Sequence, residues 1–235
     1  MPLPSAALLD TLNGPAAIVH FRSRSFLAHR GERPGTLWLI EEGWASSYKL
    51  LRDGRRHISR FYMPGDLCDP GWLAADEVDH LVVSITPIKA IALDRSRIEA
   101  RLQSDPDFTS RLALEGFVRL RAQSEWLGTL GCRSAAERLG QLVCELFCRL
   151  AANHRVEDDR CDFPLSQQDM ADFTGMTPVH VCRTLRNFKQ ECLIELQRRR
   201  LRILNFDRLA KFCGFDRSYH AAEPALPQPH LAAAA

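Results

Sequence analysis

Turn-forming residues interrupt the first part of the chain every eight to twelve positions, between about residues 18 and 93. Short runs with alternating or β-rich character lie between them, at residues 36–40, 45–51, 57–62 and 81–85. Asp53-Gly54 separates two of these runs, and this dipeptide is the strongest hairpin signal in the region. Because several short strands with regular turn signals favour a closed antiparallel architecture, the pattern predicts a small β-roll or barrel.

The pattern changes to a helical one after Leu93. From Asp105 to Asn153 no proline follows Pro106, and apolar residues recur at three- and four-residue steps. Asp105-Pro106 is typical of a helix N-cap followed by proline, and residues 134–137 have the capping-box spacing. These signals predict helices near 106–130 and 135–153, joined by a hinge at 131–133.

One stripe of the first of these helices has a 4-3-4-3-4 spacing, which suits the pairing of two helices. The stripe suits a homodimer, and packing on the β-roll of the same chain is an equal alternative. Its members are Ala113, Phe117, Leu120, Ser124, Leu127 and Gly131.

Two short helices follow an acidic segment at residues 157–159. Ser166 is placed to cap the first helix, which Gly175 ends, and Thr177-Pro178 begins the second. Residues 170, 171 and 173 of the first helix and 181, 185 and 188 of the second give each helix an apolar face. Two short helices joined by a tight turn that contains glycine predict a helix-turn-helix.

The second helix and the segment after it carry the charge that a DNA site requires. Between residues 177 and 202, seven Lys and Arg stand against two Glu, a local charge of +5, whereas the whole chain has only +2. Alternating runs at 193–196 and 201–204 flank a basic tip and predict a hairpin that would place its arginines on phosphates. The predicted DNA-binding residues are Ser166, Gln167, Thr177, Val179, His180, Arg183, Thr184, Arg186, Asn187 and Lys189, with Arg198, Arg199 and Arg200 at the hairpin.

Three segments together resemble the winged helix of the Crp-Fnr superfamily of bacterial transcription regulators. They are residues 165–171 (LSQQDMA), 175–185 (GMTPVHVCRTL) and 191–194 (ECLI), and residues 64–67 (PGDL) extend the resemblance to the sensor part of that family. It implies an α+β fold in which an N-terminal antiparallel β-roll, jelly-roll-like, precedes a long dimerisation helix and a C-terminal winged helix-turn-helix.

The resemblance also implies a division of the chain and a function. Residues 1–104 would form a cyclic-nucleotide-binding-like sensor, 105–131 the dimerisation helix and hinge, and 132–220 the DNA-binding domain, while 221–235 read as a frayed tail without periodicity. The implied function is that of a regulator, activator or repressor, which binds an inverted repeat of double-stranded DNA as a homodimer. RNA polymerase is a further candidate partner.

The sequence departs from the family pattern at two places. Val179 stands where relatives often carry glutamate before the arginine matched by Arg183, so a cytosine contact is replaced by apolar contact, for instance to a thymine methyl. Alternatively Val179 packs inside the domain, and Arg183 contacts phosphate or solvent. The segment after Gly65 lacks the arginine that holds a cyclic phosphate and carries five acidic residues up to Asp79. Cyclic AMP is therefore not the expected effector.

No cofactor or metal is expected. The eight cysteines are scattered in a chain without an export signal and read as reduced thiols. Cys144 and Cys148, at i and i+4, read as core residues rather than as a metal or redox pair, and no two histidines have ligand spacing. Trp38, Trp44 and Trp72 read as core of the β-roll.

The sequence also bears on membrane proteins, enzymes and ligand-binding proteins as alternative classes. No apolar run is long enough to span a membrane, so a cytoplasmic location is expected, and no Ser-His-Asp or Walker-type pattern predicts an enzyme. The alternative is a small-ligand-binding β-roll or cupin-like protein whose C-terminal helices serve only assembly. The basic face of the second helix favours DNA binding over assembly.

Overall fold

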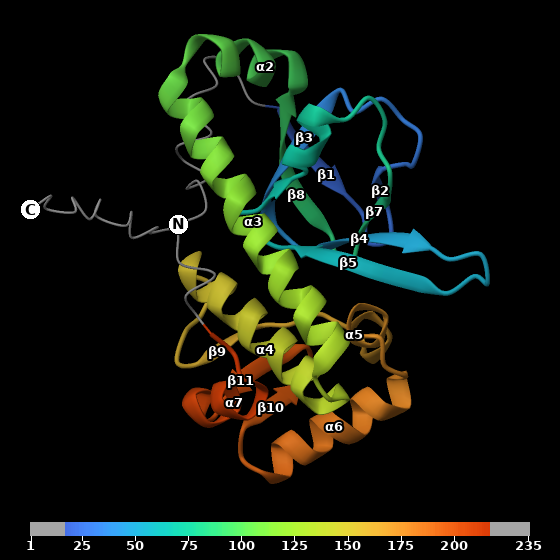
Figure 1. The fold of residues 1–235 in the computed structure, drawn as a ribbon, viewed down its shortest axis with the longest axis vertical. Helices are drawn as coiled ribbons and strands as arrows, with labels where there is room; N and C mark the ends of the chain where they lie inside the picture. The colour runs from blue at the N-terminus through green and yellow to red at the C-terminus, as the bar shows by residue number, and fades with distance from the viewer. Residues whose placement is uncertain (1–16, 217–235) are drawn as a thin grey trace, which may run out of the picture.

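The computed structural model describes residues 17–216, so the predicted tail at 221–235 lies outside the described residues. The fold is α+β: two antiparallel sheets lie at one end, a long helix crosses the molecule, and a helical domain with a small sheet forms the other end (Figure 1). The strands of the first part are β1 Ala17–Phe21, β2 Phe26–Ala28, β3 Thr36–Glu42, β4 Ala45–Leu50, β5 Arg56–Tyr62, β6 Leu67–Cys68, β7 Leu81–Ser84 and β8 Ile88–Asp94.

The predicted β-roll is confirmed as two four-stranded sheets with the strand orders β1-β8-β3-β6 and β2-β7-β4-β5. The hairpin predicted at Asp53-Gly54 joins β4 to β5, and Gly54 has a φ of 82°, a conformation that glycine adopts without strain. Strands β1, β2, β6 and β8 extend the sheets beyond the runs that the alternation indicated.

Three helices follow the β-roll: α2 Arg95–Ser104, α3 Pro106–Cys132 and α4 Ala135–Ala152. Asp105 caps α3, and Ser134 with Glu137 forms the expected capping box at the start of α4. The predicted hinge at 131–133 is too long, because α3 continues through Cys132 and the break falls at Arg133 and Ser134. Helix α2 was not predicted, although Asp94 caps it through the backbone amides of Ser96 and Arg97.

The C-terminal domain contains the predicted helix-turn-helix and hairpin. Its further elements are a strand before the first helix and a short helix at the end, neither of which was predicted. The elements are β9 Arg160–Asp162, α5 Gln167–Thr174, α6 Pro178–Gln190, β10 Ile194–Gln197, β11 Arg200–Ile203 and α7 Phe206–Cys213. Strand β9 pairs with β11, so the predicted hairpin is part of a three-stranded sheet with the order β10-β11-β9, called the wing below.

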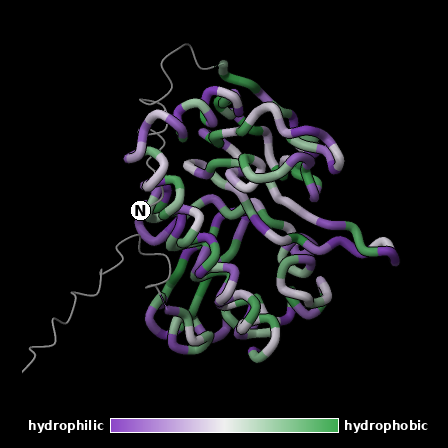
Figure 2. Tube along the Cα trace, turned by 45° about the horizontal axis from the view of Figure 1, so that its top comes forward, coloured by the Kyte–Doolittle hydropathy of each residue, from purple (hydrophilic) through white to green (hydrophobic). Residues whose placement is uncertain are grey.

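Two hydrophobic clusters form the core, and one of them joins the two ends of the molecule. The first lies inside the β-roll and includes Trp72, while the second packs Trp44, between β3 and β4, and Phe61 of β5 against α3, α4 and the C-terminal domain. Trp44 and Trp72 are buried as predicted, and Trp38 is half-buried. Along the helices the tube in Figure 2 changes repeatedly between apolar and polar colours, as expected for helices with one buried face.

No helix among residues 17–216 combines the length and the apolar character that crossing a membrane requires.

Candidate DNA-binding interface

Local capping chemistry fixes the helix-turn-helix. Ser166 Oγ accepts a hydrogen bond of 3.0 Å from the amide of Asp169, and the Asp169 carboxylate accepts one of 3.0 Å from the amide of Ser166. Gly175 ends α5 with a φ of 67°, and Thr177 Oγ1 accepts from the amide of His180 to begin α6. The tight turn therefore follows from the residue types that the sequence provides at both helix ends.

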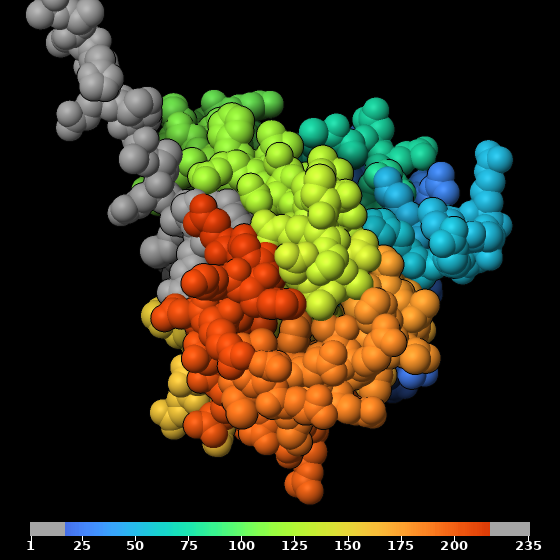
Figure 3. All heavy atoms as spheres, turned by 60° about the horizontal axis from the view of Figure 1, so that its bottom comes forward, coloured from blue at the N-terminus to red at the C-terminus, as the bar shows by residue number. Residues whose placement is uncertain are grey.

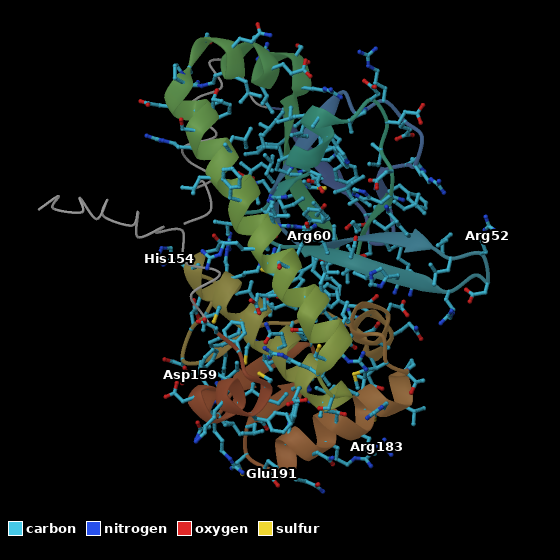
Figure 4. The ribbon with its side chains drawn as sticks, viewed as in Figure 1. Arg52, Arg60, His154, Asp159, Arg183 and Glu191 are labelled. Atoms are coloured by element: carbon cyan, nitrogen blue, oxygen red, sulfur yellow. The ribbon has the colours of Figure 1, made fainter. Side chains whose placement is uncertain are left out.

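The exposed face of α6 is centred on Val179 and Arg183. Val179 is 80% exposed, the largest fraction among the exposed apolar side chains of the described residues, so it does not pack inside the domain. Arg183 follows at i+4 and Arg186 at i+7, and both are exposed with no ion pair to any described residue. Figure 4 shows Arg183 pointing away from the rest of the molecule.

Other predicted residues of α6 lie at the flanks of this face. Asn187 and Lys189 are exposed, and His180 is half-buried. Thr184 was predicted on the exposed face, and this is wrong, because Thr184 is only 4% exposed. It lies three residues after Val181 and four before Phe188, and the helical repeat turns it toward the same core.

Gln190 is exposed on the same face and was missed by the sequence analysis. Its spacing from Arg186 and Arg183, at i+4 and i+7, was the available signal. Ser166 and Gln167 are exposed at the start of α5, and Thr177 is exposed at the start of α6. The hydroxyl groups of Ser166 and Thr177 already act in the helix caps.

The hairpin after α6 has the predicted basic tip. Gln197 pairs with Arg200, which leaves Arg198 and Arg199 as a two-residue loop with φ values of 48° and 64°. Two consecutive positive φ values are the signature of a type I′ turn, which normally uses Asn or Gly. Arg198 to Arg200 are all exposed, and Arg200 Nε lies 3.7 Å from a carboxylate oxygen of Asp162 on β9.

The apolar stripe of α3 faces away from its own chain. Phe117, Leu120 and Leu127 are 62%, 61% and 74% exposed, and Ala113 and Ser124 are exposed beside them. Phe108 and Trp126, on other faces of the helix, are buried. The alternative in which the stripe packs on the β-roll of the same chain is therefore wrong. In Figure 3 the yellow-green end of α3 lies beside the orange surface of the helix-turn-helix.

The β-roll and the C-terminal domain meet through an interface that was not predicted from the sequence. Arg56 of β5 forms ion pairs of 2.7 Å with both Asp169 and Asp172 of α5. The ring of Phe61 stacks on Phe173 with 5.1 Å between centroids. These pairs join residues more than a hundred positions apart, and no local pattern in the sequence signals them.

Arginines from α3 and α4 neutralise two of the acidic residues that follow β5. Asp66 pairs with Arg149 of α4 at 2.6 Å, and Asp69 lies 3.5 Å from Arg119 of α3. Burial acts to raise the pKa of Asp69, but Arg119 and other partners hold it below its ordinary value. The predicted repulsion of a phosphate by five acidic residues is therefore too simple, since these two carboxylates are already paired.

The described residues contain no cluster of three or more His, Cys, Asp and Glu side chains arranged to hold a metal ion. Cys144 is buried in the core, and Cys148 packs against it as predicted. The Sγ atom of Cys144 lies 4.0 Å from that of Cys213 on α7. His20, His29 and His57 are exposed, and His80 is half-buried beside Asp79.

Comparison with known proteins identifies the family. A model of the Crp-like helix-turn-helix domain matches residues 137–212, and one of the cyclic nucleotide-binding domain matches residues 18–105. The nitrogen fixation regulation protein FixK of Azorhizobium caulinodans is 31% identical over 174 residues, covering 74% of this chain and 69% of the relative. The transcriptional activator protein FnrL of Cereibacter sphaeroides is 27% identical, covering 79% and 76%.

The fold agrees with these relatives. The structure of FixK2 from Bradyrhizobium japonicum superposes with a TM-score of 0.77 at 24% identity, covering 84% of this chain and 97% of that one. The chain belongs to the Crp-Fnr family of transcription regulators. It is a DNA-binding transcription regulator of the Crp-Fnr type, as its relatives are regulators of transcription or of nitrogen fixation.

Proposed function

We propose that the protein binds an inverted-repeat DNA site as a homodimer, with α6 of each protomer in a major groove. The observation that carries this proposal is the exposed face of α6, where Val179, Arg183 and Arg186 project without partners among the described residues. Arginine can hydrogen-bond to guanine through two donors, and a valine side chain can contact a thymine methyl. The exposed tip of the wing supplies basic groups for phosphates on the flank.

The dimer is supported by the unpaired stripe of α3. Large apolar side chains exposed in a row at helical spacing leave a surface that a second copy of the same helix would cover. We divide the chain accordingly into a sensor at residues 1–104, a dimerisation helix at 105–131 and a DNA-binding domain at 132–220. A contact with RNA polymerase would be a further step, and because the partner is DNA we place the site of action in the cytoplasm.

Cyclic AMP is not the effector that this sequence favours. No arginine occurs between Arg60 and Arg95, and Asp66 and Asp69 are paired within the protein. The cyclic-nucleotide-binding architecture is therefore proposed to serve a different ligand.

The test is selection of bound sites from random DNA, followed by gel shifts on the selected inverted repeat. Half-site centres about 34 Å apart are expected, and five inserted base pairs should abolish tight binding because they rotate one half-site to the opposite face. Leu120→Glu should give a monomer by sedimentation equilibrium, whereas Leu51→Glu, at an exposed position of the β4–β5 hairpin, should not. Unchanged affinity after the insertion would contradict the dimer.

A further inference from the structure

The chain passes from the lower end of α3 into the C-terminal domain through a break of two residues (Figure 1). Arg133 and Ser134 form this break, and both are extended, with ψ values of 149° and 160°. The backbone amide of Arg133 still donates to the carbonyl oxygen of Thr129 in α3, whereas Ser134 caps α4. The direction of the C-terminal domain relative to α3 therefore depends on these two residues and on the contacts around them.

The side chain of Arg133 connects this break to the last helix of the domain. Its Nη1 donates to the carbonyl oxygen of Cys213, and its Nη2 donates a hydrogen bond of 2.9 Å to the carbonyl oxygen of Gly214. Nη1 also donates one of 3.1 Å to Oε1 of Gln141, a fully buried side chain of α4. A residue whose backbone continues α3 thus holds two segments of the domain, one of them 80 residues further along the chain.

The end of α7 is a suitable place for an arginine. Gly214, with a φ of 60°, ends this helix, and the last carbonyl groups of a helix have no partner within it. A positive charge at this end of a helix is favourable, and the planar guanidinium presents several donors at fixed angles. Arg133 therefore restricts both the position and the angle of the end of α7 relative to the break.

Helix α7 packs closely on both α4 and α6. A Cβ atom added to Gly140 of α4 would lie 2.9 Å from Cβ of Cys213, so the two helices are in close contact there. On another side, the ring of Phe212 meets the ring of Phe188 of α6 with 5.8 Å between centroids. A contact that holds the end of α7 therefore also holds α6, the proposed recognition helix.

A second contact along α3 adds to the restriction of its angle. Trp126 donates through Nε1 to the carboxylate of Glu145 of α4, and its ring packs on Phe173 of α5. Trp126 lies about two helical turns before Arg133, or about 10 Å along the axis. Two contacts at this separation restrict the angle of a helix more than one contact does. Trp126 is buried in the core, whereas Arg133 is half-buried and can be replaced without opening the core.

We propose that Arg133 is a positioning residue for DNA recognition, which holds the domain against α3 so that two protomers present α6 at one half-site spacing. The inference rests on the proposed function, because it requires a dimer on an inverted repeat. Binding of the second half-site by a dimer is an intramolecular step, and its gain in affinity depends on whether the geometry allows both contacts at once. A loosened break would reduce this gain at the correct spacing and would reduce the penalty at other spacings.

The test is the spacing profile of DNA binding, measured by gel shifts of the full chain on a single half-site and on inverted repeats with inserted base pairs. Each insertion moves one half-site by about 3.4 Å and turns it by about 35°. Arg133→Gln should bind the best repeat at least about tenfold more weakly than wild type, and its affinity should fall less steeply with insertion. Its affinity for the single half-site should be unchanged, because the exposed face of α6 is intact.

Lys211→Gln is the matched control. Lys211 is exposed in the last turn of α7, so this variant removes a positive charge from the same helix end but leaves the contacts of Arg133 intact. It should keep the wild-type spacing profile. Arg133→Lys keeps the charge but loses the fork of donors, so its profile should lie between those of wild type and Arg133→Gln. A melting curve of each variant checks folding, and Arg133→Lys carries the test if Arg133→Gln does not fold.

Three results would overturn the proposal. They are a wild-type spacing profile in the folded Arg133 variants, an equal loss of affinity for the half-site and for every repeat, and the same flattening of the profile by Lys211→Gln. The second result would make Arg133 only a stabilising residue of the domain, and the third would assign the effect to charge at the end of α7.

Hydrogen exchange of the free protein separates this inference from the proposed function. Arg133→Gln should exchange the amides of residues 129–135 faster than wild type, and this measurement does not involve DNA. Unchanged exchange there would also contradict the proposal. Failure of the proposed function would instead appear in wild type, as no gain in affinity from the second half-site.

Discussion

The guanidinium of Arg56 on β5 holds the carboxylate of Asp172 on α5 through a hydrogen bond of 2.7 Å from Nε to Oδ2. Its Nη2 donates a second bond of 2.7 Å to Asp169 on the same helix. Burial acts to lower the pKa of Arg56, but the hydrogen bonds to Asp172 and Asp169 raise it above its ordinary value. A single side chain of the β-roll thus binds the first helix of the helix-turn-helix at two points.

Replacing Arg56 should weaken this connection. Arg56→Ala is expected to lower the free energy of unfolding by about 1–3 kcal/mol, because two largely buried carboxylates lose a charged hydrogen-bond partner. Arg55→Ala is a matched control, since Arg55 pairs with Asp53 at the exposed hairpin and such pairs contribute about 0–1 kcal/mol. Denaturant unfolding measures both, and equal losses would show that the Arg56 pairs act as ordinary surface pairs.

Glu145 gives a prediction for pH. Burial is the largest influence on the pKa of Glu145 and raises it, while Arg149 and the hydrogen bond from Trp126 act in the opposite direction. The folded state therefore holds this proton more tightly than the unfolded state. Ionising the buried Glu145 therefore lowers the free energy of unfolding. This loss is absent below the unfolded pKa of about 4.3, develops as the pH rises, and is complete above the folded pKa.

Glu145→Gln should remove that loss. The variant is expected to melt higher than wild type at pH 8, by about 2–4 °C for each kcal/mol regained, and the difference should shrink as the pH falls toward 4. Glu125→Gln, an exposed substitution on α3, serves as the control and should show no such trend. A Glu145→Gln variant that loses stability equally at every pH would contradict this account.

Local signals were sufficient for much of the fold and of the site. The caps at Ser134, Ser166 and Thr177, the Asp53-Gly54 turn and the alternation around the wing each act within a few residues, so the sequence indicates them directly. The helical repeat likewise placed Arg183 and Arg186 outside. The prediction was wrong at Thr184 because its hydroxyl group suggested exposure, whereas the helical repeat turns this position toward the core.

Other features depend on contacts between distant segments. The pairing of Arg56 with α5, the arginines that neutralise Asp66 and Asp69, and the contacts of Arg133 with α7 involve residues separated by tens to more than a hundred positions. Hydrophobic periodicity carries no information about such pairs. Helix α7 is different, because it was not predicted although Asn205 as its cap and Gly214 at its end are local signals.

The backbone conformation and the charge of the wing can be tested by two different measurements on one variant. Arg198 and Arg199 both have positive φ, which non-glycine residues adopt at a cost, whereas Asn-Gly is favoured in this turn. The double variant Arg198→Asn and Arg199→Gly should therefore unfold at a higher temperature than wild type but bind DNA more weakly. Each lost phosphate contact should reduce the slope of log affinity against log salt by about 0.9, for cognate and random DNA alike.

The matched control for the wing is Arg97→Gln on α2, which is also exposed but lies at the opposite end of the molecule (Figure 1). This substitution should leave the salt slope unchanged. A wing variant that kept the wild-type slope would show that the hairpin does not contact phosphates.

Arg183 should dominate base discrimination. A bidentate contact with guanine contributes about 1–3 kcal/mol against the wrong base, so Arg183→Ala should flatten the preference at one position in each half-site. Arg208→Ala is a suitable comparison, because this exposed arginine is already paired with Glu191. Site selection with each variant measures the effect, and a uniform loss of affinity with unchanged preferences would assign Arg183 to phosphate instead.

Val179 provides the sharpest test of the exposed face of α6. The side chain is 80% exposed, so Val179→Glu should leave the melting temperature nearly unchanged. A glutamate at this position can accept a hydrogen bond from cytosine N4, whereas valine offers only apolar contact. Site selection should therefore shift one position of each half-site from thymine, or from tolerance, toward cytosine. A folded variant with the wild-type base preferences would remove position 179 from the DNA contact surface, because a new acceptor that reached the base edges would change the selected base.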